Sequence, residues 1–169
     1  MKLKKGVYLK FMPISKKMKK TIALFLFAMF FVAAFGQNKK AAKELKPLVD
    51  KYIKAWNTGN VDLLNDVCHE DSARIMSPTS RSAASSLQGL KGVITGLRTS
   101  YPDFNVKLVE VIYLETKVIS RYKFSGTNTG PGEIAPTGKK YSGTGISISN
   151  FKNGKFIEEW AEVDNLSTM

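Results

Sequence analysis

The sequence predicts an α+β fold, in which helices come first and an antiparallel sheet follows. Two observations carry this prediction. Three segments before residue 100 repeat apolar residues at the helical spacing, and several segments after residue 103 alternate at the strand spacing. A chain of 169 residues is typical of one domain. Helices followed by a run of strands indicate an α+β arrangement.

Residues 1–36 are predicted to be a secretory signal peptide. Its core, residues 18–36, has lysines at the start, an apolar run over 22–35 and small residues at the end, which places cleavage between Gly36 and Gln37. The apolar run is too short for a comfortable transmembrane helix, and an uncleaved N-terminal anchor is the alternative. We therefore expect an exported protein, periplasmic or secreted, with no stable membrane anchor after cleavage.

Most of the net charge of +12 belongs to this leader. Residues 1–36 hold eight of the 26 basic residues and none of the 14 acidic ones, so residues 37–169 carry 18 basic and 14 acidic residues, about +4. The remaining lysines are scattered, which is weak support for binding nucleic acid, and we expect none to be bound. Residues 37–169 are expected to form a single domain.

Three helices are predicted. The first covers 38–58, in which one apolar face repeats every three or four residues. A second, short helix is expected at about 61–68, and a third at 87–99. The members of the buried faces are Val49, Tyr52, Ile53 and Trp56 in the first helix and Leu90, Val93, Ile94 and Leu97 in the third. The polar segment 77–86 between them is expected to form a mobile loop at the rim of a pocket.

Strands are predicted on both sides of the third helix. A short one is expected at 70–76, before the helix. The others follow it, at 104–114, 117–126, 140–151 and 155–165, with a glycine- and proline-rich connection over 126–138. The last two form a hairpin around Asn153-Gly154.

The reactive residue types offer no separate site. Cys68 is the only cysteine, so no internal disulfide is possible, and its apolar surroundings favour a buried thiol over a reactive one. His69, Glu70 and Asp71 follow it, but consecutive residues at a helix end point in different directions, so a solvated helix end is expected rather than a metal site. Arg121 could face either the interior or solvent.

The last hairpin has two possible registers, and a slip of one residue moves every side chain to the other face. A two-residue loop would pair Phe151 with Phe156, whereas a three-residue loop would pair Phe151 with Lys155. We favour the three-residue loop, because it gathers large apolar residues on the face that the helices cover. That face would hold Ile146, Ile148, Asn150, Phe156, Glu158, Trp160, Glu162 and Asp164, and the outward face would hold Ile157, Ala161 and Val163. The alternative is that the end of the strand leaves the sheet, so that Glu162 and Asp164 meet water.

Three segments carry recognisable motifs: YPDFNVKLVEV, GTNTGPGEIAPTGKKYSGTGISISNF and NGKFIEEWAEVDNL. They resemble the SnoaL-like polyketide cyclase family, also labelled ester cyclases, of the nuclear-transport-factor-2-like superfamily. The shared motifs are Pro102-Asp103, Gly126-Thr127, Gly130, Pro136-Thr137-Gly138, Gly145-Ile146, and Gly154-Lys155 through Asp164. The resemblance covers roughly residues 45–166.

The resemblance implies a cone-shaped, cystatin-like α+β fold, in which a curved antiparallel sheet wraps about three helices around an apolar cavity. It also implies a homodimer formed through the outer face of the sheet, which would give a use to Ile157, Ala161 and Val163. The expected ligand is a small hydrophobic molecule.

The resemblance further implies a catalytic residue. In characterised members an Asp at the end of a Trp-x-x-x-Asp strand acts as general acid and base without a metal or organic cofactor, and the matching residue is Asp164. The expected pocket residues are Trp160, Glu158, Asn150, Ile148, Ile146, Phe156 and Asn128. Asn128 stands where the family has His, and an amide donates hydrogen bonds but cannot shuttle protons near neutral pH.

Two functions from different classes follow from these expectations. The first is cyclase- or isomerase-like proton-transfer chemistry on a small hydrophobic carbonyl compound. The alternative is a non-catalytic small-molecule-binding or dimeric scaffold module with the same fold.

Overall fold

A computed structural model describes residues 39–76 and 83–164, all within the second of the two units into which the chain divides, Gln37–Met169. The predicted signal peptide, and residues 77–82 of the predicted loop, lie outside the described residues. Within the described ranges, no helix is both long and apolar enough to cross a membrane.

The helices lie where the periodicity predicts them. The helix of residues 39–58 buries Val49, Tyr52 and Trp56. The predicted helix 61–68 is divided into a 3₁₀ turn, η1 (Val61–Leu63), and one α-helical turn, α2 (Leu64–Val67). Helix α3 (Leu87–Ser100) begins at Ser86, whose Oγ accepts a hydrogen bond of 3.1 Å from the backbone N–H of Gly89.

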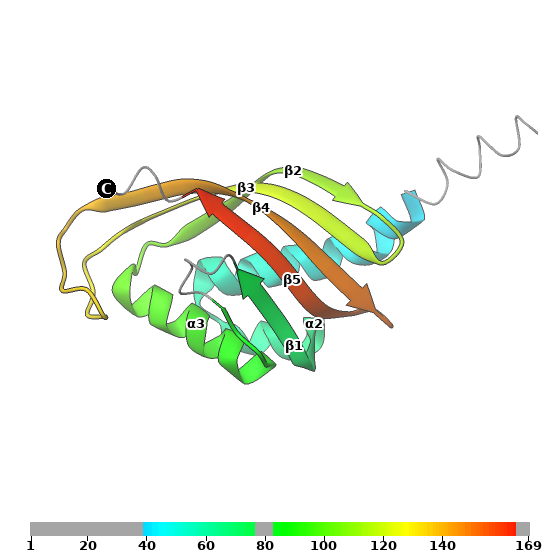
Figure 1. The fold of residues 1–169 in the computed structure, drawn as a ribbon, viewed down its shortest axis with the longest axis horizontal. Coiled ribbons are helices and arrows are strands. Elements are labelled where there is room, and N and C mark those ends of the chain that lie inside the picture. The colour runs from blue at the N-terminus through cyan, green and yellow to red at the C-terminus, as the bar shows by residue number, and fades with distance from the viewer. Residues whose placement is uncertain (1–38, 77–82, 165–169) are drawn as a thin grey trace, which may run out of the picture. The chain divides into compact units, whose positions relative to one another are not determined.

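Five strands form one sheet in the order β1-β5-β4-β3-β2. Their bounds are β1 (Cys68–Met76), β2 (Asn105–Tyr113), β3 (Lys117–Thr127), β4 (Lys140–Lys152) and β5 (Lys155–Asp164). The sheet curves over the helices, which all lie on one side of it (Figure 1). The prediction of a purely antiparallel sheet is wrong, because β1 runs parallel to β5. No hairpin joins these two strands, and the long connection between them permits a parallel pair.

The hairpin of β4 and β5 closes with the two-residue loop Asn153-Gly154, so the three-residue register is wrong. Both loop residues have left-handed backbones, with φ of 52° and 70°, as a type I′ turn requires, and Phe151 pairs with Phe156. A β-bulge follows at once. Asn150 pairs with Glu158 rather than with Ile157, which leaves Ile157 as the extra residue.

This bulge reverses the alternation along β5. Phe156 points to the helices, and a regular strand would send Trp160, four residues later, in the same direction. Instead Trp160 is 53% exposed, and Ile148, its partner across the ladder, is 41% exposed. Trp160 and Asp164 do share a face with Ile146 and Ile148, as predicted, but it is the outer face. Their expected inward orientation is therefore wrong.

The helix-covered face holds the residues that were expected to look outward. Ala161 is buried there, Val163 is partly buried against the core, and Ile157 in the bulge is half-buried. The expectation that these three residues supply an outer dimer face is therefore wrong. A buried carboxylate, Glu159, lies between Ile157 and Ala161.

Aromatic rings run through the core from one end of the sheet to the other. Tyr52 stacks on Phe156 with ring centroids 5.1 Å apart, and its edge meets Trp56 at 6.3 Å. The contacts continue from Trp56 through Phe104, Phe124 and Tyr141 to Tyr101. These aromatic side chains give the interior its apolar character.

Two of the sequence motifs meet in a structural contact. The carboxylate of Asp103 accepts hydrogen bonds from the backbone N–H of Thr127 at 2.6 Å and from its Oγ1 at 2.7 Å. These hydrogen bonds hold the pKa of Asp103 below its ordinary value. The motifs Pro102-Asp103 and Gly126-Thr127 therefore join the end of the α3–β2 turn to the end of β3.

Candidate active site

The outer face of the sheet holds six of the eight predicted site residues. Ile146 is 53% exposed, and Ile148, Trp160 and Asp164 are also exposed, whereas Glu158 is half-buried. Asp164 ends β5 opposite Thr144 of β4. The structure brings these residues together on one surface, but not on the side that the helices cover.

Asn150, another predicted pocket residue, links two charged groups on this outer face. Its Nδ2 donates a hydrogen bond of 2.7 Å to Glu158 Oε2, and its Oδ1 accepts one of 2.7 Å from Lys117 Nζ. Asn150 thus joins Lys117 of β3 to Glu158 of β5.

Phe156 and Asn128 are buried, as a pocket wall requires, but far apart. Phe156 lies in the core near the β4–β5 turn, whereas Asn128 follows the last residue of β3 at the opposite end of the sheet. The Oδ1 of Asn128 accepts a hydrogen bond of 2.8 Å from the N–H of Thr137. Since a backbone N–H only donates, this contact fixes the amide orientation, and the buried Nδ2 has no hydrogen-bond partner among the described residues.

The helix-covered face contains a polar pair that the sequence did not predict. Glu159 of β5 is only 5% exposed, and its Oε2 accepts a hydrogen bond of 3.1 Å from Tyr52 Oη of the helix of residues 39–58. Tyr52 in turn packs against Phe156 and Trp56. A carboxylate beside a phenol in apolar surroundings is an arrangement suited to moving protons.

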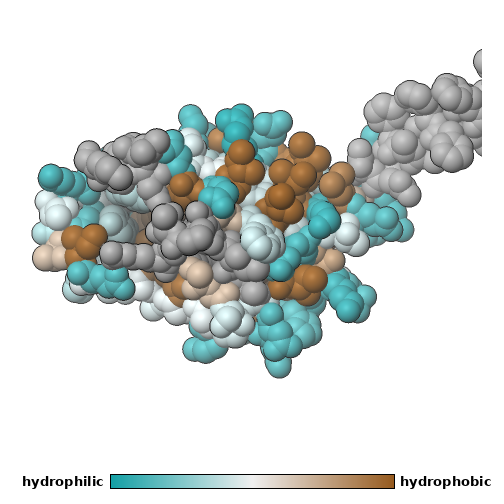
Figure 2. Space-filling model, in the orientation of Figure 1, coloured by the Kyte–Doolittle hydropathy of each residue, from teal (hydrophilic) through white to brown (hydrophobic). Residues whose placement is uncertain are grey.

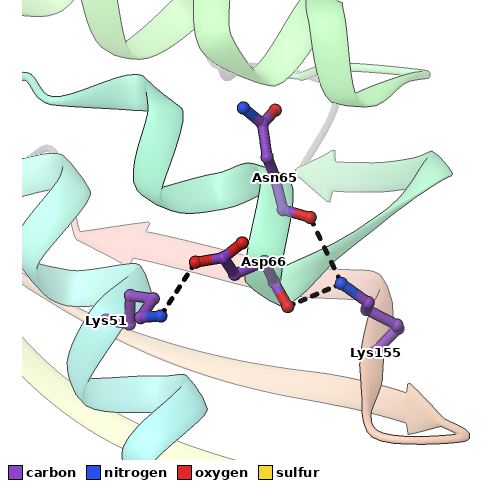
Figure 3. Close-up of polar contacts among 4 residues, drawn as sticks. All are labelled: Lys51, Asn65, Asp66 and Lys155. Atoms are coloured by element: carbon purple, nitrogen blue, oxygen red, sulfur yellow. Dashed lines mark hydrogen bonds and ion pairs between the residues drawn. The ribbon is translucent and has the colours of Figure 1, made fainter.

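Polar contacts at the start of β5 hold this pair together (Figure 3). Lys155 Nζ donates to the backbone carbonyls of Asn65 and Asp66 at 3.2 and 2.6 Å, and a lysine at the C-terminal end of a helix is favourable. Asp66 Oδ2 also pairs with Lys51 Nζ at 3.0 Å. Because Lys51 precedes Tyr52, this chain of contacts fixes the helix relative to the strand that carries Glu159.

Cys68 lies in the same part of the core and is confirmed as a buried thiol. Burial raises its pKa to about 12, and the negative charge of Glu159 adds to the shift. The thiol therefore stays protonated at neutral pH, which excludes it as a ready nucleophile. His69, Glu70 and Asp71 after it are exposed, at the start of β1 rather than at a helix end.

The inner face next to Glu159 is lined with small residues. Ser149 pairs with Glu159 across the ladder, and Ser147 pairs with Ala161. Further along β4, Gly145 lies under the Tyr122 ring, where an added Cβ would stand 2.5 Å from Tyr122 Cζ. The strip from Ser149 to Gly145 thus has few side-chain atoms of its own, and the rings of β3 cover its far end.

The described residues contain no group of three or more His, Cys, Asp or Glu side chains placed to hold a metal ion. Arg121, left open by the sequence, is exposed on the outer face and pairs with Glu110 at 3.4 Å. The inner face offers the acid–base chemistry of Glu159 and of Tyr52, which donates a hydrogen bond to it.

The architecture, a curved sheet with its helices on one face, is that of nuclear-transport-factor-2-like proteins. A model of the SnoaL-like polyketide cyclase family matches residues 46–169, and the chain belongs to this family. A comparison with curated proteins finds no match.

Solved structures share the fold. TsrD from Streptomyces laurentii has 22% sequence identity and a TM-score of 0.64, over 73% of this chain and 90% of TsrD. A candidate polyketide cyclase from Bacillus cereus ATCC 10987 has 26% identity and a TM-score of 0.63, over 76% and 79% of the two chains. IdmH, a candidate polyketide cyclase from Streptomyces antibioticus, has 20% identity and a TM-score of 0.61, over 72% and 92%. These similarities confirm the predicted fold class.

Sequence reasoning missed Glu159 because it placed the wrong face of β5 inside. One signal could have identified the loop, though not the carboxylate. Asn-Gly is the dipeptide that two-residue hairpin loops prefer, and that loop points Phe151 and Phe156 inward together. The bulge at Ile157, which then turns Glu159 inward, has no sequence signature of its own.

Proposed function

We propose that the protein catalyses acid–base chemistry of the cyclase or isomerase type on a small hydrophobic carbonyl compound, with Glu159 as the group that moves the proton. The observation that carries the proposal is the buried hydrogen bond between Glu159 and Tyr52 on the helix-covered face. Membership of a polyketide cyclase family supports the reaction class.

The proposed reaction is an intramolecular aldol closure. The Glu159 carboxylate takes a proton from the carbon next to a carbonyl, and the electron pair released forms a C–C bond to a second carbonyl carbon of the same molecule. The oxygen of that carbonyl then takes the proton back from Glu159. The net change moves one proton from carbon to oxygen, and no electron donor or acceptor is consumed.

Tyr52 has a positioning role in this scheme. Its hydroxyl donates a hydrogen bond of 3.1 Å to Glu159 Oε2, which orients the carboxylate. Because its ring packs against Phe156 and Trp56, the hydroxyl cannot easily swing away. The small side chains of Ser147, Ser149 and Ala161 would admit an apolar substrate beside the carboxylate.

Asp164, the residue that the family resemblance favours, stays a prediction for the same role. It is exposed on the outer face at the end of β5, where the medium is water rather than an apolar pocket. A carboxylate shielded from water is the better candidate for taking a proton from carbon. The two carboxylates are five residues apart in one strand, so they can be tested as a matched pair.

The test is solvent deuterium exchange at carbon. A panel of alicyclic and aryl ketones is screened for binding by saturation-transfer NMR, and the binders are incubated with protein in D2O while loss of the α-proton signal is followed. We expect Glu159→Gln to slow exchange by at least about 100-fold, since general-base catalysis contributes 10²–10⁴. Asp164→Asn should stay within about threefold of the unmodified protein.

The other outcomes are equally informative. Loss of exchange in Asp164→Asn with retention in Glu159→Gln would place the base at Asp164. Compounds that bind but never exchange would favour the alternative function, a non-catalytic module that binds small molecules. Tyr52→Phe serves as a control for position, because it keeps the carboxylate and removes only its donor.

We also propose that the protein is exported and that residues 1–36 are removed. The support is the arrangement of lysines, apolar residues and small residues over 18–36. N-terminal sequencing of protein from the periplasm or medium of its host should give Gln37 as the first residue. Protein that retains these residues and sediments with membranes would contradict the proposal.

A further inference from the structure

We propose that the hydroxyls of Ser147 and Ser149 donate hydrogen bonds to the carbonyl oxygen of the substrate and stabilise the negative charge that forms on it when the neighbouring carbon loses its proton. The proposal rests on the proposed function, in which Glu159 takes that proton. It is carried by the placement of the two serines beside Glu159 on the helix-covered face of the sheet.

Strand β4 buries small polar residues and exposes large apolar ones. Ser147 and Ser149 are 4% and 8% exposed, whereas Ile146 and Ile148 are 53% and 41% exposed. In Figure 2, hydrophobic side chains gather at the surface over the sheet among hydrophilic ones. Hydrophobic burial alone would favour the reverse orientation of this strand. The inward direction of the two serines therefore calls for another reason.

A third serine, Ser120 of β3, lies beside them. It pairs with Ser147 across the β3–β4 ladder and is also buried. The structure shows no hydrogen bond from any of these three hydroxyls to another described residue. A buried hydroxyl without a partner costs free energy, and such groups in native proteins commonly have a catalytic role or hold a buried water. Three of them beside a buried carboxylate fit a site that binds a polar group of a ligand.

The register of the sheet sets the spacing between these hydroxyls and Glu159. Ser149 is the partner of Glu159 across the β4–β5 ladder, and Ser147 pairs with Ala161, two residues further along each strand. Residues directly opposite have Cβ atoms about 4.5–5.5 Å apart, and diagonal neighbours about 7–8 Å. A base within about 3 Å of a carbon and a donor within about 3 Å of the adjoining carbonyl oxygen stand about 5–8 Å from each other. The two serines therefore lie in the range that the reaction needs.

Two hydroxyl donors would act on the charge that the reaction creates. Removal of the proton breaks a C–H bond, and its electron pair forms the C=C bond of an enolate, whose oxygen becomes negative. Hydrogen bonds to a charged oxygen are stronger than those to a neutral carbonyl, so the donors stabilise the enolate more than the ketone. The serines keep their own protons throughout, and the proton that leaves carbon passes to Glu159 alone.

The first test measures binding of 4-nitrophenolate, a stable anion whose oxygen lies on an sp2 carbon as in an enolate. The full chain carries Glu159→Gln, which resembles the protonated carboxyl group, and binding is followed by the visible absorption of the phenolate. We expect Ser147→Ala and Ser149→Ala each to weaken binding by at least about tenfold, because each removes a hydrogen bond to a charged oxygen. Ser142→Ala, at an exposed position of the same strand, is the matched control and should stay within about twofold.

The second test follows deuterium exchange of the α-protons of cyclohexanone. In the otherwise unmodified chain, Ser147→Ala and Ser149→Ala should each lower kcat by about 100-fold and leave KM within about threefold, because the donors act mainly on the charged enolate. Ser120→Ala, one strand further from Glu159, should lower kcat by less than about threefold.

Thermal unfolding separates this catalytic role from a structural one. Ser147→Ala and Ser149→Ala remove hydroxyls that have no hydrogen-bond partner among the described residues. Both variants should therefore melt at or above the temperature of the unmodified chain, even though they lose activity. A structural role for the hydroxyls would lower the melting temperature instead.

The results that would overturn the proposal differ from those that would overturn the proposed function. Phenolate that does not bind to the Glu159→Gln protein, or that binds equally well after either serine substitution, would exclude the serines as donors. Normal exchange in both serine variants, with loss in Glu159→Gln, would also exclude them and leave the proposed function intact. If instead Glu159→Gln exchanges as fast as the unmodified chain, the proposed function fails, and the phenolate measurement still decides whether the serines bind an oxyanion.

Discussion

Glu159 and Trp160 are adjacent in β5, yet the carboxylate is buried and the indole is half in solvent. The hydropathy of the residues alone predicts the opposite. The difference shows that the contacts available to a side chain, and not its hydropathy alone, decide which face of the strand it occupies. Glu159 has a hydrogen-bond partner, Tyr52, in the interior, whereas Trp160 lies beside Ile148 on the outer face of the sheet. The inner face of the strand holds the carboxylate that we propose for the chemistry, and the outer face leaves a large apolar side chain exposed.

The largest expected effect is a difference in the free energy of unfolding between substitutions on the inner and outer faces of β5. Phe156→Ala should lower the free energy of unfolding by about 3–5 kcal/mol, because it leaves a cavity beside Tyr52. Trp160→Ala, four residues later, should cost less than about 0.5 kcal/mol. Urea unfolding measures both losses. Equal losses would mean that Trp160 is buried within its own chain.

The second comparison concerns polar contacts. Tyr52→Phe should cost about 1–3 kcal/mol, because it leaves a buried carboxylate without its phenol donor. Asn150→Ala breaks the link between Lys117 and Glu158 on the outer face and should cost less than about 1 kcal/mol. The same unfolding experiment applies. A larger loss for Asn150→Ala would reverse the assignment of the two faces.

The third comparison uses backbone positions in β4. Gly145→Ala should cost about 1–3 kcal/mol, because the new methyl group would stand 2.5 Å from the Tyr122 ring and force it to move. Thr144→Ala, its neighbour on the outer face, should change the free energy of unfolding by less than about 0.5 kcal/mol. Thermal unfolding monitored by circular dichroism distinguishes them.

The smallest effect is a pH dependence of the free energy of unfolding, which arises from the buried thiol of Cys68. The pKa of Cys68 is about 12 in the folded protein against an ordinary value near 9, so the native state disfavours the thiolate. The protonated thiol therefore contributes its full stabilisation below pH 9, and this contribution falls as the pH rises toward 12. We expect a loss of about 1 kcal/mol between pH 8 and pH 10 that Cys68→Ala removes. An identical alkaline loss in both proteins would show that the thiol is not involved.

Most of the fold could be predicted from the sequence, because periodicity reports which residues a helix or strand buries. The helix faces around Tyr52 and Ile94 follow directly from their spacing. The parallel pairing of β1 with β5 could not be predicted, since neither strand carries a signal for its neighbour across a long connection.

The candidate site was harder to predict, because one extra residue in β5 decides which side chains of that strand face the helices. The extra residue at Ile157 exchanges the two faces of β5, so Trp160 and Asp164 leave the interior and Glu159 enters it. A bulge of this kind depends on how the strand meets its neighbours and not on local composition. The predicted cluster of Ile146, Ile148 and Trp160 does exist, but on the surface that faces away from the helices.

The orientation of β5 underlies the proposed role of Glu159, and nuclear Overhauser contacts test it most directly. Selectively labelled protein should show contacts between the ring protons of Tyr52 and the side-chain protons of Glu159. The Trp160 indole should show none to the helix of residues 39–58. Contacts between that indole and the helix, with Glu159 facing solvent, would contradict the account.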